Sequence, residues 1–286
     1  MPWCYAASVR TSRQMQHAAG QTIGGFSLVR QLGTGAMGEV WRASRGEENV
    51  ALKVMHPVLA HDVAFRARFL REARIAREIA HPHLVPVVAA GDDAGTLFLA
   101  SRLIPGGTLD QHLREGGPLQ PDELSGTIDQ LASALDAVHR AGLVHRDVKP
   151  ANVLLDDGGS ALLADFGLAT GPALTVLTKP GQVVGTPHYL APELVRGEEA
   201  QAASDVYSLG CLAYALLTGA PPFVGGGSFR VLAAHLGDPP PDPVASRPEL
   251  SRRFALALLT ALAKRPEDRP HGAIAYALGL RRALSA

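Results

Sequence analysis

Three glycines near the start of the chain have the spacing of a phosphate-binding loop, in the run Gly33-Thr34-Gly35-Ala36-Met37-Gly38-Glu39-Val40. Glycine lets backbone N–H groups approach a phosphate without an intervening side chain. A dinucleotide-binding loop would continue into a helix after the third glycine. Here Gly38 is followed by the strand-like alternation EVWRA, which predicts a hairpin folded over a nucleotide. Taken alone, the run is better explained as an ordinary glycine-rich turn.

A lysine and a glutamate could extend this phosphate site. Lys53 ends an apolar strand, and Glu72 lies on the apolar-facing side of a helix predicted over residues 63–80. A buried ammonium needs a partner, because its desolvation alone costs several kcal/mol, on the order of 5. We therefore expect Lys53 and Glu72 to pair; the alternative is that both are solvated surface residues. Only four of the 27 basic residues are lysines, which weakly indicates that a retained lysine needs an ammonium.

Three further motifs follow in order. His145-Arg146-Asp147-Val148-Lys149-Pro150-Ala151-Asn152 lies between a predicted helix and a predicted strand hairpin. Asp165-Phe166-Gly167 follows the apolar run ALLA, and Ala191-Pro192-Glu193 comes later. An isolated Asp147 or Asn152 would be a turn or cap residue, but an ordered set of this kind is not expected by chance.

Together these motifs resemble those of a eukaryotic-type (Hanks-type) serine/threonine protein kinase of the bacterial kind, over about residues 26–284. The resemblance implies an α+β, bilobal protein-kinase fold. Its small β-rich N-lobe would carry one long helix, and its larger C-lobe would be mainly helical. It also implies transfer of the γ-phosphate of ATP to Ser/Thr hydroxyls of proteins, with Mg²⁺, or alternatively Mn²⁺, as the cofactor.

The resemblance assigns chemical roles to individual residues. Asp147 would accept the proton of the incoming hydroxyl, and Lys149 would reach the γ-phosphate. Lys53, held by Glu72, would contact the α- and β-phosphates. Thr186, in Gly185-Thr186-Pro187-His188-Tyr189, would bond the catalytic Asp and Lys and shape the acceptor pocket.

Two residues are expected to bind metal, and a larger set is expected to bind the nucleotide. Asn152 and Asp165 are hard oxygen ligands suited to Mg²⁺. Ser101 stands at the gatekeeper position, where relatives often have a larger residue, and Arg102 stands where many have Glu. The expected nucleotide-binding residues are Gly33, Thr34, Gly35, Ala36, Met37, Gly38, Val40, Ala51, Lys53, Ser101, Arg102, Leu103, Asn152 and Asp165.

Other residues are expected to support or regulate the site. Arg146 precedes the catalytic Asp and would pair with a phosphothreonine of the activation loop. Thr178 is the favoured autophosphorylation site, with Thr175 as a second candidate, and Thr170 is also present in that loop. By resemblance, His145 is structural, Asp205 braces the catalytic-loop backbone, and Arg269 pairs with Glu193.

The elements that must position these residues fall into two groups. Short strand-like runs and the helix over 63–80 occupy the first hundred residues, and helical stripes dominate the remainder. Residues 1–22 lack periodicity and are interpreted as a flexible tail. We expect an N-lobe over 23–104 and a C-lobe over 105–286, forming a single kinase domain over 23–284.

The amino-acid composition limits the classes of binding partner that we expect for this chain. The 286 residues hold 27 basic and 27 acidic side chains, and this balance argues against nucleic acid or an anionic membrane as the main partner. Two cysteines cannot form a disulfide framework or a zinc site, and no apolar run reaches the roughly 18 residues of a membrane span. We therefore expect a cytoplasmic protein. The sequence leaves open a homodimer and a natural continuation into a membrane or sensor region.

Two alternatives compete with an active protein kinase. An ATP-binding pseudokinase or scaffold would regulate partners without phosphoryl transfer, but pseudokinases usually lack part of the catalytic set, and here the set is complete. A small-molecule kinase, such as an antibiotic phosphotransferase, would lack the G-T-x-x-Y and A-P-E segments present here.

Overall fold

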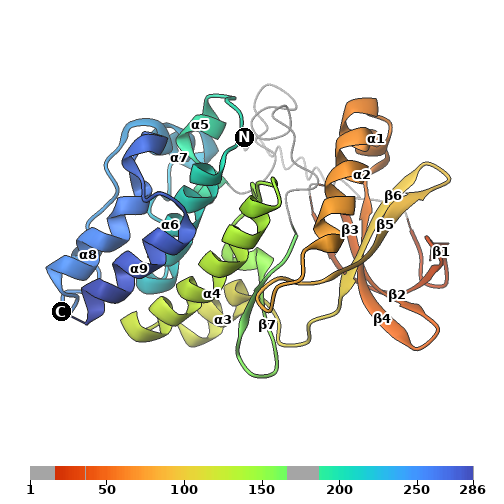
Figure 1. Ribbon diagram of the computed structural model, residues 1–286, viewed down its shortest axis with the longest axis horizontal. Helices are drawn as coiled ribbons and strands as arrows, with labels where there is room; N and C mark the ends of the chain where they lie inside the picture. Colours follow the sequence, from red (N-terminus) through yellow and green to blue (C-terminus); the bar gives the residue numbers. More distant parts are fainter. Residues whose placement is uncertain (1–16, 36, 166–186, 286) are drawn as a thin grey trace, which may run out of the picture.

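The small lobe is built on a six-stranded antiparallel sheet with the strand order β1-β2-β3-β4-β6-β5 (Figure 1). The computed structural model describes residues 17–35, 37–165 and 187–285. The strands are β1 (Thr22–Ile23), β2 (Phe26–Thr34), β3 (Gly38–Arg45), β4 (Glu48–Met55), β5 (Val87–Asp93) and β6 (Thr96–Arg102). In β3, Trp41 and Ala43 are buried, while Val40 and Arg42 on the other face are only partly so, which is the alternation that the sequence predicted.

One long helix, α2 (Val63–Glu78), packs against β5 after the short helix α1 (Pro57–Ala60). Asp62 begins α2, because its carboxylate accepts hydrogen bonds from the N–H groups of Ala64 and Phe65. The helix ends two residues before the predicted limit, at the point where Ile79 adopts an extended conformation. Its buried face includes Phe65, Phe69 and Glu72, so the predicted helix and the inward position of Glu72 are both found.

The first described residues belong to the small lobe and not to a tail. Thr22 and Ile23 pair with β2, and His17 Nδ1 lies 3.1 Å from Glu39 Oε2. Ile23 joins a cluster of buried apolar residues that includes Phe26 and Trp41. The expected limit of the tail at residue 22 therefore lies too late, since His17 already contacts Glu39 of β3 and Thr22 already pairs with Ser27 of β2.

The large lobe is mainly helical. Its helices are α3 (Leu109–Gly116), α4 (Pro121–Arg140), α5 (Pro192–Val195), α6 (Ala202–Thr218), α7 (Gly227–Gly237), α8 (Arg252–Leu259) and α9 (Ala273–Leu284). A two-stranded hairpin, β7 (Val153–Leu155) and β8 (Ala161–Leu163), matches the predicted one. Five 3₁₀ turns are also described, at Pro150–Asn152, Pro187–Tyr189, Pro243–Ala245, Thr260–Leu262 and Pro266–Asp268. The expected α+β bilobal fold is thus confirmed (Figure 1).

Helix α6 forms the centre of the large lobe, since its residues from Ser204 to Leu217 are all buried. It packs against α4, which also packs against α9. This position explains why the residues of α6 that follow Ser208 are almost all apolar, whichever side of the helix they occupy. Across the described ranges, no helix combines the length and the hydropathy needed to cross a membrane.

Candidate active site

The segment between α4 and β7 brings three of the predicted catalytic residues together. Lys149 Nζ lies 2.9 and 2.7 Å from the two carboxylate oxygens of Asp147. Asn152 Nδ2 donates to the backbone carbonyl of Asp147 at 2.8 Å and to its Oδ2 at 2.7 Å. The Asp147 carboxylate is therefore held from two sides while about a third of its side chain stays exposed.

Asp205, at the start of α6, fixes the backbone of this catalytic segment. Its carboxylate accepts hydrogen bonds from the N–H groups of His145 and Arg146, both at 2.8 Å. His139 Nε2 lies 2.7 Å from the same carboxylate, a contact that no motif in the sequence predicted. Arg146 has a φ of 67°, a left-handed conformation that costs a non-glycine residue about 1 kcal/mol or more. The buried Asp205 carboxylate helps to hold this conformation in place.

His145 has a structural position, as the resemblance implied. Its side chain is fully buried, and its Nε2 lies 3.0 Å from the Ala164 carbonyl. Burial lowers the pKa of His145 despite the nearby carboxylates of Asp205 and Asp147. A neutral imidazole at this place links the catalytic segment to the strand that precedes Asp165.

Lys53 and Asp165 form an ion pair between the two lobes. Lys53 Nζ, on β4, lies 3.0 Å from Asp165 Oδ2, which follows β8. Burial would raise the pKa of Asp165, but the Lys53 ammonium, with help from Lys149, holds that pKa below its usual value. Asp165 also has a left-handed φ of 56°. The two predicted phosphate and metal residues are thus in direct contact.

The prediction that Lys53 pairs with Glu72 is wrong. Glu72 Oε1 and Oε2 lie 3.2 and 3.3 Å from Nη1 of Arg146, and no ion pair joins Glu72 to Lys53 within the described residues. The Glu72 side chain is buried, so its carboxylate needs a cation. Arg146 supplies that cation from the catalytic segment, while Lys53 pairs with Asp165. The sequence identified the buried glutamate but not which of the nearby cations it contacts.

The glycines of the loop between β2 and β3 serve different purposes. A Cβ at Gly38 would lie 1.9 Å from the Val54 carbonyl oxygen, so glycine is required there for the close approach of β3 to β4. A Cβ at Gly33 would have no described neighbour within 4 Å, and one at Gly35 only the Gly38 oxygen at 4.0 Å. His56 supports the loop: its Nε2 lies 3.2 Å from the Gly35 carbonyl, and its N–H donates to the Met37 carbonyl. Gly33 and Gly35 are therefore the open positions at which a phosphate could approach the backbone.

The predicted adenine-binding residues lie along β4, β6 and the connection that follows β6. Ala51 and Ser101 are paired neighbours on adjacent strands, and the Ser101 hydroxyl donates to the Ala51 carbonyl at 3.4 Å. Arg102 ends β6, and Leu103 begins the connection to α3. Val40 pairs with Lys53 across β3 and β4, and Thr34 pairs with Glu39 across β2 and β3. The structure therefore brings the strand residues of the nucleotide set close to Lys53.

The chemistry of the donor set fits a magnesium ion that also binds phosphate. Asn152 uses its amide nitrogen on Asp147, which leaves its amide oxygen as an acceptor. The Ala164 N–H donates to the Asn152 carbonyl at 2.8 Å, which ties Asn152 to the residue before Asp165. Within the described ranges, no cluster of three or more His, Cys, Asp or Glu residues could hold a metal. Two protein oxygens are typical of Mg²⁺ sites that substrate phosphates complete.

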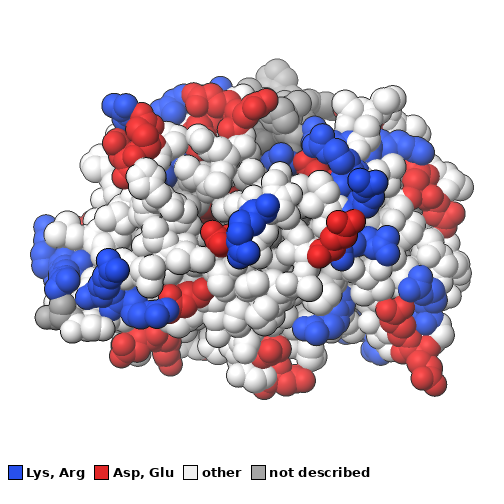
Figure 2. Space-filling model, in the orientation of Figure 1, with Lys and Arg blue, Asp and Glu red and all other residues white. Residues whose placement is uncertain are grey.

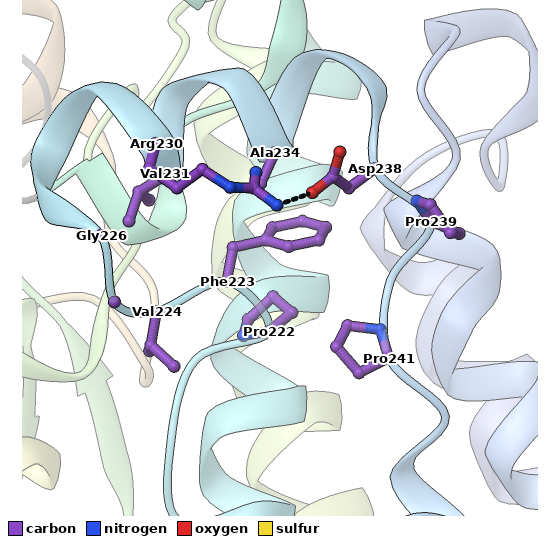
Figure 3. Close-up of a pocket in the computed structure, with 11 residues that line it drawn as sticks. Pro222, Phe223, Val224, Gly226, Arg230, Val231, Ala234, Asp238, Pro239 and Pro241 are labelled. Carbon is purple, nitrogen blue, oxygen red and sulfur yellow. Dashed lines mark hydrogen bonds and ion pairs between the residues drawn. The ribbon is translucent and has the colours of Figure 1, made fainter.

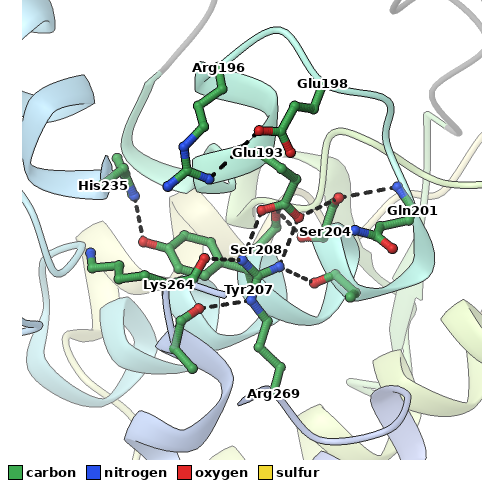
Figure 4. Close-up of polar contacts among 12 residues, drawn as sticks. Glu193, Arg196, Glu198, Gln201, Ser204, Tyr207, Ser208, His235, Lys264 and Arg269 are labelled. Carbon is green, nitrogen blue, oxygen red and sulfur yellow. Dashed lines mark hydrogen bonds and ion pairs between the residues drawn. The ribbon is translucent and has the colours of Figure 1, made fainter. Parts of the chain in front are cut away.

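A buried ion pair secures helix α5 (Figure 4). Arg269 donates to both oxygens of Glu193 at 2.8 Å, and the Ser204 hydroxyl donates to Glu193 at 2.6 Å. Burial would raise the pKa of Glu193, but the hydrogen bonds from Arg269 and Ser204 hold it below its usual value. The Glu193–Arg269 pair inferred from the resemblance is therefore present, with both side chains fully buried.

Several predicted residues lie outside the described ranges. They are Ala36 of the glycine loop, Thr186 of the acceptor segment, and Phe166, Thr170, Thr175 and Thr178.

A separate hollow of about 510 Å³ lies beside α7 in the large lobe (Figure 3). Phe223 and three prolines help to line it, and Arg230 forms an ion pair with Asp238 at 2.6 Å across its edge. None of the predicted site residues lines this hollow.

Comparisons with known proteins agree with this arrangement. A family model of the protein kinase domain matches residues 26–272. The chain is 41% identical over 268 residues to the serine/threonine-protein kinase PknH of Mycobacterium tuberculosis, covering 93% of this chain and 43% of PknH. It is 40% identical over 253 residues to PknD of the same organism, covering 87% of this chain and 38% of PknD. The chain thus spans less than half the length of these relatives.

Solved structures point to the same family. The crystal structure of the M. tuberculosis PknI kinase domain has a TM-score of 0.78 and 34% identity, with 94% of this chain and 100% of that chain covered. The chain therefore belongs to the protein kinase family, and the resemblance to bacterial serine/threonine kinases is confirmed.

Proposed function

We propose that this protein kinase is catalytically active and transfers the γ-phosphoryl group of ATP to serine or threonine hydroxyls of proteins. The observation that carries the proposal is the connected set Asp147, Lys149 and Asn152, tied through Ala164 to the Asp165–Lys53 pair. Phosphoryl transfer needs positioning and charge neutralisation more than covalent chemistry, and this set supplies both.

Asp147 is the residue that orients the acceptor. Its partly exposed carboxylate accepts the hydroxyl proton as the hydroxyl oxygen bonds to the γ-phosphorus. The bond from the γ-phosphorus to the β-phosphate oxygen breaks, and ADP leaves. Lys149, which already pairs with Asp147 at 2.7 Å, neutralises charge on the transferred group.

Asn152 and Asp165 are proposed to hold Mg²⁺ through their side-chain oxygens. The ion, when bound, neutralises charge on the phosphate oxygens. Lys53 then holds the α- and β-phosphates, while Gly33, Gly35 and their neighbours cover the phosphates with backbone N–H groups.

An exchange of ion-pair partners is proposed to accompany activation. In the structure, Glu72 contacts Arg146, and Lys53 contacts Asp165. For Lys53 to be held by Glu72, the Glu72–Arg146 contact must break and α2 must move toward β4. The Glu72 carboxylate is buried and that of Asp165 is partly buried. Each therefore needs a cation both before and after the exchange.

Phosphorylation of the loop over 168–184 is proposed to favour this exchange. The proposed acceptor is Thr178, with Thr175 as a second acceptor. A phosphothreonine is a stronger partner for a guanidinium than a carboxylate, so it would draw Arg146 away from Glu72. Arg68 lies one turn before Glu72 on α2, and its buried Nε has no hydrogen-bond partner in the described part of the chain. Arg68 is thus a second donor available to that phosphate.

A scaffold that binds ATP without transferring phosphate is the competing function. The observation that favours it is the unformed Lys53–Glu72 pair. An active kinase and a scaffold are distinguished by incubating the chain with γ-labelled ATP, Mg²⁺ and myelin basic protein and then identifying the labelled amino acids. We expect phosphoserine and phosphothreonine. Bound ATP without any labelled protein would support the scaffold, and phosphotyrosine would contradict the proposed acceptor class.

A further inference from the structure

The outward face of α2 carries a concentration of arginines. Arg66, Arg71, Arg74 and Arg77 are all exposed, whereas Glu78 is the single exposed acidic residue of this helix. Figure 2 shows blue side chains gathered over the region where α2 lies in Figure 1. The chain as a whole has no net charge, so this helix departs from the average of the molecule.

Two of these four arginines form ion pairs within the described part of the protein, and two do not. Arg66 pairs with Asp92 at 2.7 Å, and Arg71 lies 3.7 Å from Glu72, which Arg146 already contacts. Arg74 and Arg77 form no ion pair with any described residue, Glu78 included. Exposed like charges on one helix repel one another, so an external anion would relieve that repulsion.

The spacing of these arginines suits an extended acidic chain. Arg71, Arg74 and Arg77 follow one another at three-residue steps and together span about 9 Å along the helix axis. Each guanidinium can bind a carboxylate through two parallel hydrogen bonds. We propose that Arg71, Arg74 and Arg77 form a docking surface for an acidic segment of a partner protein.

An acidic protein segment fits this surface better than nucleic acid or a membrane. Nucleic-acid-binding proteins spread positive charge over a wide face, whereas this run of arginines occupies one helix of a chain with equal numbers of acidic and basic residues. Val58 and Val63 are more than 80% exposed, but they lie at the opposite end of the helix from Arg77 and are small compared with the aromatic anchors of membrane-bound helices.

The surface and the candidate active site share one helix. Glu72 lies on the buried face of α2, and the three arginines lie on the exposed side. A protein that binds α2 more tightly in one of its positions would shift the balance between a Glu72–Arg146 contact and a Glu72–Lys53 contact. The docking surface itself does not depend on the proposed phosphoryl transfer, because its test measures binding alone.

The test uses the full chain and a fluorescent octaglutamate peptide, with the affinity measured by anisotropy. The triple variant Arg71→Glu, Arg74→Glu, Arg77→Glu should bind the peptide about tenfold more weakly, since three attractive surface pairs become repulsive. Wild-type binding should also weaken steeply as salt rises, because exposed charges are screened. An octaglutamine peptide should not bind.

A matched control keeps the net charge equal. Arg30→Glu, Arg253→Glu, Arg282→Glu introduces the same charge change at exposed arginines outside α2, and it should weaken binding by less than about twofold. Equal losses in the two triple variants would overturn the proposal, as would the absence of peptide binding. Tighter binding of an oligonucleotide or of phosphatidylserine vesicles through the same arginines would overturn the partner class. If the glutamate triple variant fails to fold, Arg71→Gln, Arg74→Gln, Arg77→Gln provides the comparison.

Discussion

The carboxylate of Glu72 contacts the guanidinium of Arg146, with both oxygens within 3.3 Å of Nη1. Glu72 belongs to α2 of the small lobe, and Arg146 belongs to the catalytic segment of the large lobe. The contact therefore joins the lobes and keeps Glu72 occupied while Lys53 pairs with Asp165.

Removing the Arg146 guanidinium should raise the activity of the unphosphorylated protein. Arg146→Gln frees Glu72 to pair with Lys53, and the gain should be about twofold to fivefold, the worth of a partly exposed ion pair. Initial rates of dephosphorylated protein would measure it. Arg140→Gln, which removes an exposed Arg–Asp pair on α4, is the matched control and should leave the rate unchanged. A fall in the rate of Arg146→Gln would contradict the proposed exchange.

Lys53 should not be replaceable by arginine. The position is proposed to need a compact ammonium that reaches both Asp165 and a phosphate, and a planar guanidinium has a different geometry. Lys53→Arg should lower the phosphoryl-transfer rate about 100-fold to 1000-fold, the usual loss when one fixed donor is misplaced. The melting temperature should stay within a few degrees of wild type. Near-normal phosphoryl transfer by Lys53→Arg would contradict the proposed role of Lys53 in holding the phosphates.

The Glu193–Arg269 pair should be a major contributor to stability. Arg269→Ala leaves a buried carboxylate without its cation and should reduce the free energy of unfolding by about 3–5 kcal/mol. Urea denaturation would measure this change. Arg230→Ala breaks the exposed pair with Asp238 and should cost less than about 1 kcal/mol. Similar losses of unfolding free energy in the two variants would show that burial does not increase the contribution of the Glu193–Arg269 pair to stability.

The same pair should make stability depend on pH in the acidic range. The pKa of Glu193 is lowered in the folded protein by Arg269 and Ser204, against the opposing effect of burial. A lowered pKa means that the stabilisation is complete above the unfolded-state pKa of about 4.3 and is lost as the pH falls through the folded-state value. The free energy of unfolding of wild type should therefore fall more steeply below about pH 4.3 than that of Glu193→Gln. Parallel curves for the two proteins would contradict this assignment.

The sequence predicted elements better than it predicted contacts. The periodicity of residues 63–80 gave α2 nearly in full and placed Glu72 inward. It did not give the partner of Glu72, because Lys53, Arg71 and Arg146 are all cations and only the position of α2 decides among them. The family resemblance supplied Asp205 and the Glu193–Arg269 pair, both of which are found.

Contacts without a local pattern were missed entirely. Glu39 follows the last loop glycine and is buried, with its Oε2 bonded to the Trp41 indole and close to His17. Nothing in the spacing of these residues indicates that the segment around His17 lies over the sheet. Such contacts depend on how β1 and β2 fold back on β3, which is a tertiary property.

Phosphoryl transfer should depend on the Asp147 carboxylate, and intact mass after incubation with Mg²⁺-ATP measures this dependence. The comparison is between wild type and Asp147→Asn, which keeps the size of the side chain but removes its ability to accept the acceptor proton. We predict that wild type gains phosphate, on itself or on added myelin basic protein, and that Asp147→Asn gains none. Equal phosphate in both proteins, or none in wild type while ATP still binds, would show that Asp147 does not have the proposed catalytic role.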